Sequence, residues 1–177
     1  MEIIPEDTIE NYHNFCMLET GNQIDKTPES YLITRGALGD FLFAETNHLK
    51  GSEQNGIVFQ LFYIVVRSYR YYNLKIPDFT KQKIKYIGDI WRQRMRSHRD
   101  ATKEELIAYV KTEIKQTFLV EYVFRMLNDD VKLPKDADNF FIIEDKELLM
   151  KTYPAFFTLI DLIDEEIGKL LPDDGIY

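Results

Sequence analysis

The sequence predicts an all-α protein: a single-domain helical bundle of about five to seven helices over residues 1–177. Apolar residues recur at helical spacing along the chain, and a regular alternation of period two is absent. Glycine and proline are sparse, at 8 and 6 residues, which argues against a turn-rich β-sandwich. A hydrophobic fraction of 45% supplies a core of the size that a chain of this length needs, and it argues against disorder.

Three helices are predicted in the first part of the chain. The first covers residues 5–18, with a proline and two acidic residues in its opening turn. The second covers residues 27–49, where Thr27 is the N-cap and Gly51 follows the end. The third starts at Ser52. Its apolar, β-branched run over 57–66 would also suit a buried strand, but its neighbours are helical, so we predict a central helix.

Two longer helices follow. One covers residues 79–98, and on its wheel Trp91 lies on an apolar face that should pack against the second or third helix. The other covers residues 102–127 and opens with a capping box at 102–105. Its apolar residues repeat every four positions, a row that drifts by about 40° per step, so this helix must wrap around its neighbours or break near Thr117.

The C-terminal part is predicted to hold a polar loop, an ambiguous stretch and a last helix. The loop covers 128–139, and residues 140–153 suit a strand or a helix entry, with 146–152 helical. The last helix starts near Pro154 and ends before Pro172, with a continuous apolar stripe. Asp161, Asp164 and Glu165 lie opposite that stripe and are predicted to form a solvated face.

Charge is segregated along the chain. The net charge is −8, yet residues 67–99 carry ten basic and two acidic groups, while both ends of the chain are acidic. The overall sign argues against general coating of nucleic acid, because phosphates repel most of such a surface. Two interpretations of residues 67–99 remain: the segment forms a local binding site for an anion, or it pairs with the acidic ends of the same chain.

The basic segment supplies the candidate binding residues. On a wheel of about 100° per residue, five cations form one narrow stripe: Lys81, Lys85, Arg92, Arg96 and Arg99. Upstream, Arg67 and Arg70 alternate with tyrosines, a pattern that can stack bases while it holds phosphates. Arginine suits bidentate contact with a phosphate or a carboxylate, so the partner is an acidic protein or a nucleic acid.

Two further patterns suggest enzymes. Glu10 and Glu45 each precede a histidine by three residues, His13 and His48, which is the spacing of ligands in helical carboxylate metal sites. Separately, Arg92 and His98, with Gln93 and further arginines between them, resemble the arginine–histidine pair of helical ribonucleases of the HEPN type. That resemblance covers a handful of residues and implies a small helical ribonuclease as an alternative function.

Other catalytic and cofactor signatures are missing from the sequence. It has no glycine-rich phosphate loop, no GxSxG, no HExxH and no CxxC, so we expect no cofactor and no enzymatic activity. Cys16 is the single cysteine, and the first ten residues do not have the layout of a signal peptide, so we expect a cytoplasmic protein that does not enter a membrane. The predicted function is a helical protein-interaction module, such as a toxin-neutralising partner, a phage-type accessory or assembly subunit, or an adaptor.

Overall fold

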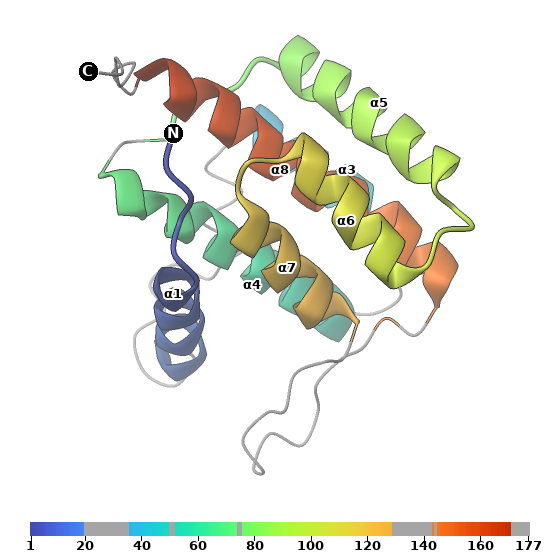
Figure 1. Cartoon of the computed structure of the whole chain (residues 1–177), viewed down its shortest axis with the longest axis horizontal. Coiled ribbons are helices and arrows are strands. Elements are labelled where there is room, and N and C mark those ends of the chain that lie inside the picture. Colours follow the sequence, from blue (N-terminus) through green and yellow to red (C-terminus); the bar gives the residue numbers. More distant parts are fainter. Residues whose placement is uncertain (20–35, 50–51, 74–75, 129–142, 144, 171–177) are drawn as a thin grey trace.

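The structure is a computed structural model that describes residues 1–19, 36–49, 52–73, 76–128, 143 and 145–170. These residues form seven α-helices and a short 3-10 helix, and none of them lies in a strand (Figure 1). The prediction of an all-α bundle is therefore confirmed. The elements are α1 (Glu6–Glu19), α3 (Ala37–Thr46), α4 (Ser52–Ser68), η1 (Tyr69–Tyr72), α5 (Lys81–Ser97), α6 (Lys103–Glu113), α7 (Thr117–Leu127) and α8 (Lys146–Leu170).

The helices α5 and α8 form an antiparallel pair that organises one side of the molecule (Figure 1). Lys83 near the start of α5 pairs with Glu165 and Glu166 near the end of α8. Further along, the Trp91 indole contacts the Phe157 ring, with ring centroids 5.2 Å apart and the planes tilted by 52°. The short helix α3 packs against both members of this pair. The three helices thereby converge where α5 ends and α8 begins.

The other side of the bundle is built on α4. Every residue from 58 to 66 except the half-buried Gln60 is buried, which explains why the sequence of this segment is also compatible with a strand: a helix buried on nearly all sides loses its polar face. The helices α1 and α7 pack against it, and α6 and α7 form a hairpin. The Phe62 ring of α4 lies 4.2 Å from the Phe156 ring of α8 and joins the two sides in one core.

Local signals in the sequence place several helix ends correctly. The Thr80 hydroxyl caps α5 by accepting a bond from the Lys83 amide. Thr102 and Glu105 form the predicted reciprocal capping box at the start of α6. The break predicted near Thr117 is also present, because Ile114 adopts an extended conformation (φ −113°, ψ 127°) that ends α6.

Two predicted boundaries are wrong. A helix running through 27–49 is interrupted at Gly36, whose positive φ of 55° and ψ of −120° are not helical, so α3 begins only after it; residues 20–35 lie outside the described part of the chain. Pro154 does not start a helix but lies inside α8. Proline removes one backbone donor from a helix, yet residues 152–160 are all buried, and their packing keeps the helix continuous.

The acidic face predicted on α8 is only partly exposed. Glu165 is exposed, but Asp161 is half-buried and accepts a 3.0 Å hydrogen bond from the Trp91 indole. Asp164 is buried and accepts a 2.6 Å bond from the Tyr69 hydroxyl. Trp91 is fully buried as predicted, but these contacts place it against α8. The helical-wheel prediction that Asp161 and Asp164 are solvated is wrong, because neighbouring helices surround most of α8.

A search of the described helices finds none with the length and apolarity that crossing a membrane requires.

Close packing of α3 on α5 leads to a testable prediction at Gly88. A methyl group at this position would lie 2.9 Å from the Phe41 ring of α3. We expect Gly88→Ala to destabilise the protein by about 1–2 kcal/mol, because the ring must move. The control is Gly168→Ala on α8, where a methyl group meets nothing within 4 Å. It should stabilise by up to about 1 kcal/mol. Urea unfolding measures both, and equal stabilisation by the two substitutions would contradict the packing of α3 on α5.

Candidate functional site

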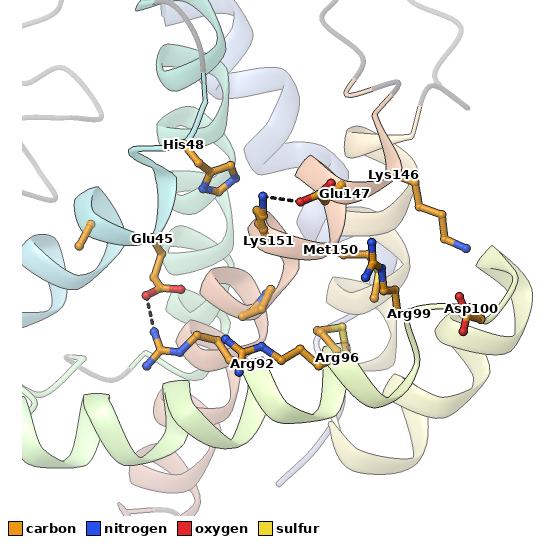
Figure 2. A pocket seen from close by; sticks show the side chains of 13 residues that line it. Glu45, His48, Arg92, Arg96, Arg99, Asp100, Lys146, Glu147, Met150 and Lys151 are labelled. Atoms are coloured by element: carbon orange, nitrogen blue, oxygen red, sulfur yellow. Dashed lines mark hydrogen bonds and ion pairs between the residues drawn. The ribbon is translucent and has the colours of Figure 1, made fainter.

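A cavity of about 620 Å³ lies where α3, the end of α5 and the first turns of α8 meet (Figure 2). Part of its wall is apolar and consists of Ala44, Met95, Met150 and Pro154. Each of the three helices therefore supplies at least one apolar side chain. A volume of this size is within the range of ordinary ligand pockets, which is about 300–1,000 Å³.

The remaining lining of the cavity is mostly charged, with an excess of cations. Five basic side chains face three carboxylates; these are Arg92, Arg96, Arg99, Lys146 and Lys151 on one hand, and Glu45, Asp100 and Glu147 on the other. The cations come from two elements that are far apart in sequence, the end of α5 and the start of α8. Their convergence gives the cavity a positive balance within a protein whose net charge is negative.

Two of the cations are already paired within the fold. Arg92 is half-buried and bonds to Glu45 of α3 and to Asp89 of its own helix. Lys151 bonds to Glu147 at 2.7 Å, one turn earlier on α8. This hydrogen bond, with a contribution from the positive charge of Arg99, lowers the pKa of Glu147. These pairs hold the walls of the cavity in place, and their charges are largely compensated.

Arg96 and Arg99 differ from these paired cations. Both are exposed, and their side chains form no ion pair or hydrogen bond with any residue that the structure describes. Arg96 lies in the last turn of α5 and Arg99 in the turn that follows the helix. The Arg99 side chain extends towards Met150, whereas the Arg96 side chain lies along α5 in the direction of Arg92 (Figure 2). Their guanidinium groups are the donors that the fold leaves available to a ligand.

The polar groups at the edges of the cavity are ordered by hydrogen bonds. The Lys146 ammonium donates to the Ala101 carbonyl at 3.0 Å and so ties the start of α8 to the turn after α5. His48 Nε2 lies 3.0 Å from the Thr152 hydroxyl, which itself donates to the Leu148 carbonyl, so the histidine nitrogen is the donor. Burial lowers the pKa of His48, so the ring is neutral at pH 7 and adds no charge.

Three of the seven predicted binding residues line the cavity: Arg92, Arg96 and Arg99. The other two members of the stripe, Lys81 and Lys85, lie in the N-terminal half of α5, away from the cavity. Lys85 is exposed, and the Lys81 ammonium lies 3.8 Å from the Asp40 carboxylate of α3. Lys81 and Arg92 both contact carboxylates of α3, so these two members of the stripe lie on the side of α5 that is next to α3. The partners of the stripe within the fold are carboxylates of α3 and α5, whereas the acidic C-terminal part of α8 binds Lys83, which is not a member of the stripe.

The basic–aromatic segment upstream of the stripe lies elsewhere. The Arg67 Nε donates to the Tyr63 hydroxyl at 2.7 Å, and its guanidinium lies over the same ring. Arg70 is exposed in η1, and neither arginine lines the cavity. Tyr69 is fully buried, and the Tyr72 hydroxyl donates to the Glu2 carbonyl. The alternation in the sequence therefore does not produce a row of exposed rings that could stack bases.

The two glutamate–histidine pairs engage other partners. Glu10 and Glu45 each form an ion pair with an arginine, Arg125 and Arg92 respectively. His13 bonds to the Tyr122 hydroxyl at 2.8 Å, and His48 bonds to Thr152. Within the described residues, no group of three or more potential ligands could hold a metal ion. The spacing is explained by ion pairs and hydrogen bonds between helices.

The arginine–histidine pair that resembles the HEPN ribonucleases is not brought together. Arg92 lines the cavity, whereas the His98 ring stacks at 3.8 Å on the Tyr109 ring of α6. The His98 Nδ1 lies 2.9 Å from the Arg94 carbonyl, and Arg94 pairs with Glu113. The two side chains of the motif thus lie in different environments.

Sequence reasoning missed the half of the cavity that α8 provides. Lys146, Met150 and Lys151 lie about 50 residues after the stripe in the sequence, in a stretch predicted to be ambiguous. The sequence carries no signal that pairs them with α5, because the antiparallel packing depends on tertiary contacts between two separated apolar faces. His48 was singled out by its spacing, but for metal binding.

A scan against models of known protein families gives no match, and searches of curated proteins and of solved structures give none.

Proposed function

We propose that this protein is a non-enzymatic interaction module that recognises an acidic segment of a partner protein through the cavity between α3, α5 and α8. The observation that supports the proposal is the pair Arg96 and Arg99, which line the cavity and whose side chains form no ion pair or hydrogen bond with the described residues. Two guanidinium groups that line the same cavity favour an anionic ligand with two or more charges, because each guanidinium can bind a carboxylate in bidentate contact.

An acidic polypeptide fits the surroundings better than a nucleic acid. Carboxylates alternate with the cations along this face, including Asp40, Asp89 and Asp100, and they would repel a continuous row of phosphates. Among the described residues, no phenylalanine, tyrosine or tryptophan lines the cavity, so bases would lack the large aromatic rings on which single-stranded nucleic acids stack. A polypeptide can instead place its carboxylates opposite the cations and neutral residues opposite the acids.

The stripe extends the surface on which a partner could dock. Lys85 is exposed on α5, outside the cavity, so a ligand longer than the cavity would meet another cation. Roles such as an adaptor, an accessory subunit or a neutralising partner all use a surface of this kind. The steering of an acidic partner by such charges raises the association rate and weakens with salt.

The test uses a fluorescein-labelled peptide in which one leucine is flanked on both sides by glutamates, with binding measured by fluorescence anisotropy at low salt. The variant is Arg96→Glu/Arg99→Glu. We expect its affinity to fall at least about tenfold, because attraction becomes repulsion. Its melting temperature should stay within about 2–4 °C, since exposed charges contribute little to folding. Arg92 is left intact, because a glutamate there would face Glu45 and Asp89.

The matched control is Arg70→Glu/Lys115→Glu, which makes the same change of net charge at exposed positions outside the cavity. It should keep most of the affinity of the unmodified protein. Equal loss in both variants would show that only net charge matters and would end the proposal. Tighter binding of single-stranded RNA or duplex DNA than of the peptide, with a steep salt dependence, would favour the nucleic-acid alternative instead.

A further inference from the structure

We infer that the partner's acidic segment carries one large apolar side chain between its carboxylates, and that this side chain enters the cavity beside Met95, Met150 and Pro154. The inference rests on the proposed function and adds the chemistry of the ligand. It follows from the composition of the cavity, whose lining combines apolar and cationic side chains from α5 and α8.

The apolar part of the cavity is suited to a side chain of variable shape. Met95 is almost fully buried, while Met150 is half-buried and can move. Methionine is unbranched and polarisable, so a surface with two of them adapts to an aliphatic or aromatic group. Pro154 and Ala44 add rigid, uncharged surface on either side. An ion alone would leave this surface exposed to water.

The volume of about 620 Å³ exceeds what one side chain fills. The occupant must therefore include the peptide groups on both sides of the apolar residue. These flanking residues would then lie near Arg96 and Arg99 at the end of α5 and near Lys146 of α8, which bonds to the turn that follows Arg99 (Figure 2). Carboxylates at the flanking positions would complement cations from both α5 and α8, which is the charge complementarity that selects an acidic segment.

The decisive comparison varies the central residue of the probe and, separately, its flanking residues. The glutamate-flanked leucine peptide is compared with the same peptide carrying alanine, and with a leucine peptide flanked by glutamines. We expect the unmodified protein to bind the first at least about tenfold more tightly than either of the others, because both the apolar and the charged contacts are needed.

Substitution at Met150 assigns the effect to the cavity. Met150→Gln keeps the length of the side chain but makes it polar, so it should remove most of the preference for leucine over alanine. Met150→Leu should retain that preference, because the surface stays apolar. Both changes affect a half-buried residue, and melting curves establish that each variant is folded.

The outcomes separate this inference from the proposed function. Equal binding of the leucine and alanine peptides, with the dependence on Arg96 and Arg99 intact, would overturn the inference and leave the function standing. Equal binding of the glutamine-flanked peptide would overturn the charged part of the inference. Failure of every glutamate peptide to bind would end both proposals.

Discussion

Replacing Trp91 with alanine should destabilise the protein by about 3–5 kcal/mol. The indole is fully buried, contacts the Phe157 ring and donates a hydrogen bond to Asp161 of α8. The substitution leaves a cavity between α5 and α8 and removes the donor from a half-buried carboxylate. Urea unfolding monitored by circular dichroism measures the change.

Trp91→Phe provides the matched control for the packing of α5 on α8. Phenylalanine keeps an aromatic ring next to Phe157 but cannot donate to Asp161, so we expect a smaller loss of about 1–3 kcal/mol. A change below about 1 kcal/mol for Trp91→Ala would mean that this face of α5 is not buried. The placement of Arg92 and Arg96 on the neighbouring face would then also be wrong.

Asp164→Asn should stabilise the protein at pH 8 by up to about 4 kcal/mol. Burial raises the pKa of Asp164 to about 7, against the hydrogen bond from Tyr69, which lowers it. Below pH 4 this carboxyl is protonated in both the folded and the unfolded protein, and its contribution to stability is fully present. That contribution is lost as the pH rises towards 7, because the folded state then holds a charged carboxylate out of water.

The test is the difference in unfolding free energy between Asp164→Asn and the unmodified protein, measured from pH 4 to pH 8. The difference should grow with pH and level off above about 7. Burial lowers the pKa values of His13 and His48, but their titration affects both proteins equally. The difference in unfolding free energy therefore reports the titration of Asp164 alone. Glu165→Gln is the control on the exposed part of α8, because Glu165 is ion-paired and accessible. A difference that does not vary with pH would contradict the burial of Asp164.

The sequence was informative where structure depends on neighbouring residues. Thr102 and Glu105 mark a helix start because a capping box bonds to amides within one turn. The drifting apolar row through 102–127 predicts a wrapped helix or a break near Thr117, and the structure has the break, at Ile114. The stripe on α5 follows from helix geometry alone. These features need no knowledge of the rest of the chain.

The sequence was uninformative where contacts between distant parts of the chain determine the structure. Pro154 reads as a helix start, but burial on all sides keeps α8 continuous through it. Asp164 reads as solvated because a wheel cannot show that Tyr69, about 95 residues earlier, covers this face. For the same reason Arg96 and Arg99 were found as candidates, while Met150 and Lys146, which complete the cavity with them, were not.

The most direct test of the cavity as a recognition site is an exchange of charges between protein and ligand. The dissociation constant of a leucine peptide flanked by lysines is measured for Arg96→Glu/Arg99→Glu and for Arg70→Glu/Lys115→Glu, which have the same net charge. If the cavity binds the ligand, the first variant should bind this peptide at least about tenfold more tightly than the second, because its new carboxylates lie beside the apolar wall. Equal affinity in the two variants would contradict the cavity as the binding site.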